Sequence, residues 1–182
     1  MKRTTILAVV GGIAIVALGS FFLLTGNADK KTESNALAPQ SIKQMVYDYS
    51  VGNLSGKSAS ITSHQLIVDG ETADSKSYAL PKDEFFVSIA PYVKQTHPCE
   101  IHSLTGCQGE MTEQKFQVNI TDAKGKTVLD QTMTSQSNGF IDLWLPRDQT
   151  YRITVGHDGK TAESEISTFE NDKTCITTLQ LS

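Results

Sequence analysis

The sequence has few cysteines, few aromatic residues and no excess of basic side chains. Its 182 residues include three Cys and 7% aromatic residues, and 16 Lys and Arg stand against 20 Asp and Glu, for a net charge of −4. An acidic surface repels phosphate backbones, and no basic run offsets it, so a nucleic-acid partner is excluded. A chain of this length buries a core without covalent cross-links, so the cysteines require another explanation than holding the fold.

Common catalytic motifs are also missing. The sequence has no G-x-S-x-G, no H-E-x-x-H and no C-x-x-C, and its acidic residues are scattered without an evident pair. Residues 52–58 resemble a phosphate-binding loop but have three residues between the glycines where four are needed. Hydrolase and thioredoxin-type mechanisms therefore have no support in the sequence.

The N-terminus carries an export signal. Lys2 and Arg3 precede an uncharged apolar run over residues 6–24, long enough to span a bilayer. The length of the run favours a retained membrane anchor, whereas the small residues at 26–28 favour a cleaved signal peptide, and both interpretations of residues 1–28 stay open. Residues 29–39 are polar and predict a flexible linker. The rest of the chain is expected outside the cytoplasm, in the periplasm or on the outer face of the cytoplasmic membrane.

A short helix is predicted over residues 41–51. Ser41 and Gln44 have the spacing of a capping box, and Gly52 follows the last turn. Four larger side chains fall on one helical face: Ile42, Met45, Val46 and Tyr49. This apolar face requires a larger partner in the same domain.

The remaining segments alternate with period two, which is typical of β-strands. Residues 62–68 and 85–89 predict the strands of a hairpin unit over 59–92, and several strands with turn residues between them follow over 115–181. This spacing predicts a mainly β protein: an antiparallel β-sandwich-like domain with a preceding β-hairpin unit and one short N-terminal helix. His64 lies on a predicted strand and His157 at a turn, and we interpret both as structural.

The unusual chemistry is concentrated in a loop over residues 96–109. It holds Cys99 and Cys107 together with His97 and His102, while the third cysteine, Cys175, opens the last strand. Thiolates with nearby imidazole suit Cu(I) best and zinc second, and seven intervening residues between the loop cysteines disfavour a zinc knot. Cys99 and Cys107 are also a candidate redox disulfide, because closing it releases two electrons, enough to reduce two Cu(II) ions.

Simpler interpretations remain beside this one. Cys99 and Cys107 could form an ordinary disulfide that stabilises the loop. Cys175 is in phase with apolar positions of its strand, which is common for a buried cysteine without a ligand role. The alternative function is therefore a disulfide-containing β-sandwich module that recognises a cell-wall or protein partner without metal.

The loop and several strand motifs resemble CueP, the periplasmic copper-binding protein family. The resemblance covers roughly residues 40–182 and includes all three cysteines. The segments that carry it are Ala90-Pro91-Tyr92, Thr96-His97-Pro98-Cys99, His102-Ser103-Leu104-Thr105-Gly106-Cys107-Gln108-Gly109-Glu110, Asn138-Gly139-Phe140, Leu143-Trp144-Leu145-Pro146, Thr174-Cys175 and Thr177-Thr178-Leu179-Gln180-Leu181.

This resemblance implies a copper-handling protein of the cell envelope that binds the metal through Cys99, Cys107 and Cys175. It raises Cys175 from a core residue to a ligand, with His97 or His102 as an auxiliary ligand. It also implies reduction of Cu(II), delivery of copper to a copper,zinc superoxide dismutase, and a homodimer.

Overall fold

The structure, a computed structural model, describes residues 34–35 and 38–182. The predicted signal peptide or anchor at 1–28, and residues 29–33 and 36–37 of the predicted linker over 29–39, lie outside the described residues. In the part of the chain that is described, no helix is long and apolar enough to cross a membrane.

The single helix of the described chain, α1, spans Pro39–Ser50 and so begins before the predicted start at residue 41. The predicted capping box is not formed: the N-cap is Ala38, whose side chain makes no capping hydrogen bond. Pro39 explains the earlier start, since proline lacks the N–H group that the first turn would leave unpaired. Gln44 instead donates to Asp48 Oδ1 one turn later, at 3.2 Å.

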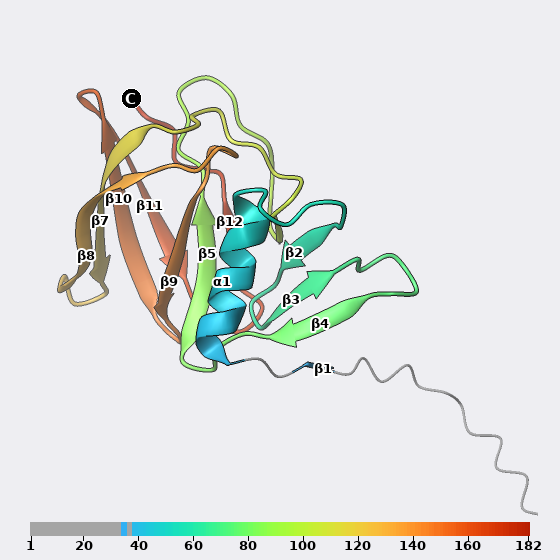
Figure 1. The fold of residues 1–182 in the computed structure, drawn as a ribbon. Helices are drawn as coiled ribbons and strands as arrows, with labels where there is room; N and C mark the ends of the chain where they lie inside the picture. Colours follow the sequence, from blue (N-terminus) through green and yellow to red (C-terminus); the bar gives the residue numbers. More distant parts are fainter. Residues whose placement is uncertain (1–33, 36–37) are drawn as a thin grey trace, which may run out of the picture. The chain divides into compact units, whose positions relative to one another are not determined.

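The strands of the described chain form three β-sheets (Figure 1). The five-stranded sheet has the order β1 (Ser34–Asn35), β4 (Lys76–Ala79), β3 (Gln65–Val68), β2 (Ala59–Ile61) and β6 (His102–Ser103). The three-stranded sheet has the order β12 (Cys175–Ile176), β5 (Glu84–Ile89) and β9 (Ile141–Pro146). The four-stranded sheet has the order β11 (Lys160–Ser167), β10 (Thr150–His157), β7 (Lys115–Asp122) and β8 (Thr127–Thr134).

The main core lies between the three-stranded and four-stranded sheets. It takes alternate residues from β5, β9, β7 and β10, which include Phe85, Leu143, Phe116 and Tyr151. Within the four-stranded sheet all neighbours are antiparallel, and β5 and β9 are also antiparallel. The prediction of a mainly β, sandwich-like fold is therefore confirmed.

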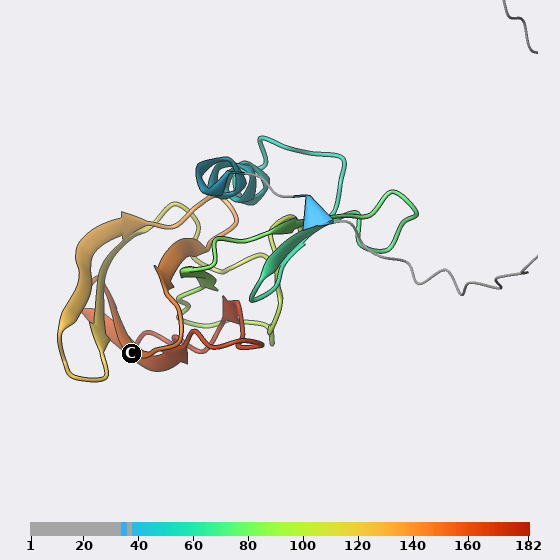
Figure 2. The ribbon, with the colours of Figure 1, turned by 90° about the horizontal axis from the view of Figure 1, so that it is seen from below.

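The helix covers the other face of β5 (Figures 1 and 2). Ile42 and Val46 of α1 are buried in a second core with Phe86 of β5 and with residues of β2 and β3. A helix of twelve residues is marginal by itself in water, so this packing is what stabilises α1.

The pairing of β5 differs from the predicted hairpin unit. β2, β3 and β4 form a small meander of their own, whereas β5 pairs with β9 and β12 in another sheet. The reason is visible in the sequence of β5, which is buried on both faces rather than on one. A strand with two apolar faces belongs between two layers and not at the surface of a hairpin.

This central position of β5 also places the candidate site. Period-two alternation points Phe85, Val87 and Ile89 into the main core, and Phe86, Ser88 and Ala90 to the opposite face. Ser88 pairs with Cys175 of β12. A third, small cluster then forms around Ala90, Phe140 and Cys175, with Cys99 and Cys107 packed against it.

Candidate metal centre

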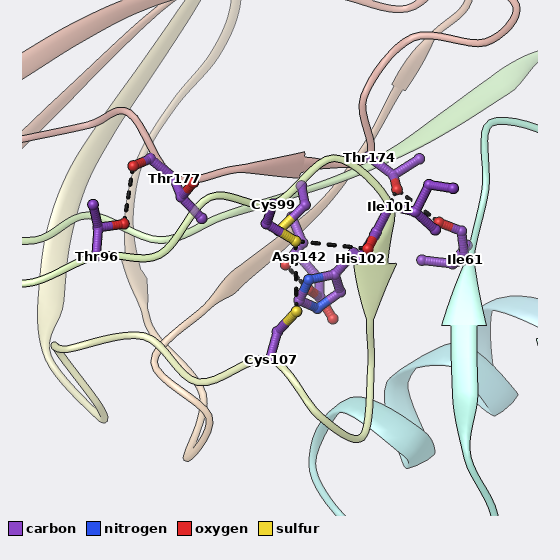
Figure 3. The surroundings of a disulfide bond; sticks show 11 residues. Ile61, Thr96, Cys99, Ile101, His102, Cys107, Asp142, Thr174 and Thr177 are labelled. Carbon is purple, nitrogen blue, oxygen red and sulfur yellow. Dashed lines mark hydrogen bonds between the residues drawn. A yellow bond between two sulfur atoms is a disulfide. The ribbon is translucent and has the colours of Figure 1, made fainter.

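Four side chains from two segments far apart in the sequence meet at this third cluster, and Figure 3 labels three of them, Cys99, His102 and Cys107. Their ligand atoms, the sulfurs of Cys99, Cys107 and Cys175 and a ring nitrogen of His102, all lie within 4.8 Å of one another. Cys99 precedes β6, His102 opens β6, Cys107 follows it, and Cys175 opens β12. The fold therefore brings together all three predicted thiols and one of the two predicted histidines.

The sulfur atoms form a bonded pair and a close neighbour. Cys99 and Cys175 are joined by a disulfide with a Cα–Cα distance of 5.6 Å, and Cys107 is the free cysteine of the described chain. The Cys107 Sγ lies 3.5 Å from the Cys99 Sγ. The pair predicted from the sequence was Cys99 with Cys107, whereas the bond in this structure joins Cys99 to Cys175. Spacing along the chain does not indicate this bond, because β-sheet pairing brings Cys175 back to Cys99 across a sequence separation of 76.

His102 is an anomaly that a ligand would explain. Its side chain is fully buried, and neither ring nitrogen finds a hydrogen-bond partner among the described residues. Buried polar groups are nearly always paired, because leaving one unpaired costs about 1–3 kcal/mol. The ring instead packs on Phe140, with centroids 4.5 Å apart. A metal ion in the cluster would satisfy one of these nitrogens.

The same burial keeps the His102 imidazole neutral. Burial lowers the pKa of His102 from 6.5 to about 4; the carboxylate of Asp142 opposes this shift and His97 adds to it. Neutral imidazole is the form that binds a metal ion. His102 is thus ready to act as a ligand at neutral pH without first losing a proton.

The other three histidines lie apart from the four-residue group. His97 is half-buried, packs edge-on against Phe140 at 6.3 Å, and has a buried Nε2 without a partner among the described residues. His64 Nδ1 contacts Ser63 Oγ at 3.1 Å, and His157 Nδ1 lies 2.8 Å from the backbone oxygen of Lys115. Between the two candidate histidines, the geometry favours His102.

Asp142 of β9 is a site residue that the motif analysis missed. Its carboxylate lies beside the cluster (Figure 3) and accepts hydrogen bonds from Ser88 Oγ and Ser50 Oγ, both at 2.6 Å, and from Gln136 Nε2 at 3.1 Å. These three hydrogen bonds fix the position of the Asp142 side chain beside the cluster. A single acid within the apolar run of β9, and a single serine within that of β5, were the sequence signals that mark this network.

Thr174 fixes the relative positions of His102 and Cys175. Its hydroxyl donates to the backbone oxygen of Ile61 at 2.6 Å and accepts from the backbone N–H of His102 at 3.0 Å (Figure 3). The backbone N–H groups of Thr174 and Cys175 both donate to the backbone oxygen of Glu100. The strand that carries Cys175 is thereby tied to Ile61 of β2 and to the backbone of Glu100 and His102 in the Cys and His loop.

Glu110 and Gly109 hold the loop that carries Cys107. The Glu110 carboxylate accepts three backbone N–H groups from residues 93–95, at 2.7, 2.9 and 3.2 Å, and these bonds, led by that of Lys94, lower the pKa of Glu110. Gly109 donates from its backbone N–H to Asn138 O at 2.7 Å and crosses Gly139 so closely that an added Cβ would lie 2.6 Å from the Gly139 oxygen.

We expect Gly109→Ala to displace this loop. Because the obstacle is backbone, it cannot move aside as a side chain would, and the substitution should cost about 2 kcal/mol of unfolding free energy. Urea unfolding of the reduced protein measures that loss. Gly156→Ala is the matched control: neither glycine has a positive φ, and the nearest atom to a Cβ added at Gly156 lies 3.9 Å away. An equal effect of the two substitutions would mean that the close crossing has no energetic role.

The donor set decides which metals fit. Up to three thiolates and one imidazole form a soft site that suits Cu(I) and, second, zinc, and that binds hard cations poorly. The thiols can also be oxidised in place, because the Cys99 sulfur lies next to both other sulfurs. The reduced thiols are therefore able to bind a soft metal ion, and two of them are able to give up two electrons by forming a disulfide.

The fold and the site define a β-sandwich-like protein whose three cysteines and His102 form a partly buried cluster that could hold a soft metal ion. The family model described as "Periplasmic copper-binding protein CueP" matches residues 45–180. The chain belongs to the CueP family. It is similar to the protein in the "Crystal Structure of S.CueP", with 42% identity, a TM-score of 0.73, and coverage of 78% of this chain and 88% of that one. No curated protein matches the chain.

Proposed function

We propose that this protein binds copper as Cu(I) outside the cytoplasm, through Cys99, Cys107 and Cys175, with His102 as a further ligand. The observation that carries the proposal is the convergence of three sulfurs and one unpaired, buried imidazole within 4.8 Å. Zinc fits the same donors less well. Membership of a family described as periplasmic and copper-binding supports both the metal and the compartment.

Reduction of Cu(II) is the second part of the proposal. Two thiols closing to a disulfide release two protons and two electrons, and two Cu(II) ions accept the electrons and become Cu(I). We expect Cys99 to be one of the two sulfurs that form this disulfide, because it is bonded to Cys175 and lies 3.5 Å from Cys107. The protein would thus turn Cu(II) into Cu(I) and retain it away from the solvent.

Transfer of this copper to a copper,zinc superoxide dismutase, and assembly as a homodimer, complete the proposal. Both are supported by the family resemblance of the cysteine motifs. Location in the periplasm or on the outer face of the cytoplasmic membrane follows from the predicted export signal at residues 1–28.

The decisive experiment follows copper and thiols together. Fully reduced protein is mixed anaerobically with Cu(II) and a chromophoric Cu(I) chelator strong enough to remove bound copper, and thiols are counted before and after. We expect one Cu(I) for each thiol lost, with two thiols lost per molecule. Protein whose thiols have been alkylated is the control and should produce no Cu(I). Intact thiols without Cu(I) or bound copper would favour the metal-free binding module.

A further inference from the structure

The three sulfurs of the site differ in exposure and in whether their segments belong to a paired strand. Cys175 is 1% exposed, lies on β12 and is held through its pairing with Ser88 of β5. Cys99 and Cys107 are half-buried and lie in segments outside regular strands. In the oxidised protein the disulfide therefore includes the least accessible sulfur, and the free thiol is one of the more accessible ones.

We propose that Cys107 is a relay thiol that moves this disulfide to the accessible pair. The Cys107 thiolate attacks the Cys99 sulfur, a Cys99–Cys107 bond forms, the Cys99–Cys175 bond breaks, and Cys175 leaves as a thiolate that takes up a proton. One S–S bond replaces another, so no external oxidant or reductant is needed. The 3.5 Å separation between the Cys107 and Cys99 sulfurs places the attacking atom in contact with its target.

The exchange is favoured kinetically by the architecture of the site. A thiol held in contact with a disulfide acts at a far higher effective concentration than a reagent in solution. Only loop side chains need to turn, because Cys107 and Cys99 both lie outside the paired strands while β12 keeps its place. Once the bond joins Cys99 and Cys107, a dithiol from solution attacks the Cys107 sulfur and restores three thiols while it is itself oxidised to a disulfide.

This inference deepens the proposed function, since an oxidised site must be reduced before it can take up Cu(I) again. Only the biological purpose of the exchange, the recovery of a copper-binding site, rests on the proposed function. The chemistry involves no copper, and its test is made on metal-free protein, so failure of the relay would be distinguishable from failure of copper binding.

The test uses oxidised, metal-free protein and has two readouts. First, exchange is stopped with acid, the protein is digested with pepsin in acid, and the disulfide-linked peptides are identified by mass spectrometry. We expect both the Cys99–Cys175 and the Cys99–Cys107 linkages in the wild type. Second, dithiothreitol is added under native conditions and thiol release is timed. We expect Cys107→Ser to be reduced about tenfold more slowly than the wild type.

Two controls separate the relay from general effects on the loop. Gln108→Ala alters the exposed neighbour of Cys107 but keeps the thiol, and it should be reduced at the wild-type rate. In denaturant the wild type and Cys107→Ser should also be reduced at equal rates, since the folded contact is gone. Finding only the Cys99–Cys175 linkage in the wild type, or equal native reduction rates for the wild type and Cys107→Ser, would overturn the proposal.

Discussion

Replacing Cys99 by Ser is expected to abolish Cu(II) reduction and to remove most of the stability that oxidation gives the protein. Cys99 is the shared neighbour of the other two sulfurs, bonded to one and 3.5 Å from the other. The bond closes a loop with a sequence separation of 76, for which the chain-entropy relation gives about 4 kcal/mol. Urea unfolding of the oxidised and reduced forms measures the stability, and the Cu(I) chelator assay measures the reduction.

Cys107→Ser is the matched control for the stability part of this prediction. It retains the Cys99–Cys175 bond, so its oxidised form should remain about 4 kcal/mol more stable than its reduced form. The reduced wild type and the reduced Cys99→Ser protein should differ by less than about 1 kcal/mol, since the exchange of sulfur for oxygen is small. Oxidised Cys99→Ser with wild-type stability, or with full production of Cu(I), would show that Cys107 and Cys175 form a working pair without it.

The C-terminal half of the fold was the part best predicted from sequence. β7 and β10 alternate cleanly between buried and exposed residues, because each packs one face on the core and turns the other to solvent. β5 has no such alternation, and its place between two layers depends on residues far away in the sequence. For that reason periodicity identified β5 as a strand but not its partners.

The sequence identified the residues that the fold brings together in the Cys and His cluster, but not which two sulfurs are bonded. The clustering of rare Cys and His residues at 96–109 pointed to the loop, and the family resemblance added Cys175. Which two sulfurs are joined depends on how β12 returns beside β5, and spacing along the chain carries no information on that. The choice between His97 and His102 likewise required the burial of each ring, which only the packing around Phe140 determines.

The supporting residues were the least predictable part of the site. Thr174 and Glu110 are ordinary polar residues in the sequence. Their side chains support the site by hydrogen bonds to backbone groups that only folding brings near them. Asp142 and Ser88 are different, because a polar residue in an otherwise buried strand has to find a partner. They find each other across paired strands, with Ser88 directly opposite Asp142 in the register of β5 and β9.

His102→Phe is expected to stabilise the metal-free protein while weakening Cu(I) binding. Phenylalanine keeps the aromatic packing on Phe140 and removes two buried nitrogens that lack partners among the described residues. Removing unpaired buried polar groups should raise the unfolding free energy by about 1–3 kcal/mol. Loss of one ligand should weaken Cu(I) binding by about tenfold, or ~1.4 kcal/mol, measured by competition with a chromophoric chelator.

The same variant should change the pH dependence of stability. The pKa of His102 is about 4 in the folded protein and 6.5 in an exposed reference, so the unfolded chain binds the proton more readily between these values. Stability is therefore complete above about pH 6.5 and falls as the pH drops towards 4, by about 2 kcal/mol between pH 7 and pH 5. His102→Phe should lack this part of the loss, whereas His64→Ala should retain it. Wild-type pH dependence together with wild-type Cu(I) affinity in His102→Phe would show that His102 is not part of the metal site. A more stable metal-free protein that binds Cu(I) more weakly would instead mean that the buried imidazole lowers the stability of the metal-free state and is kept there as a ligand.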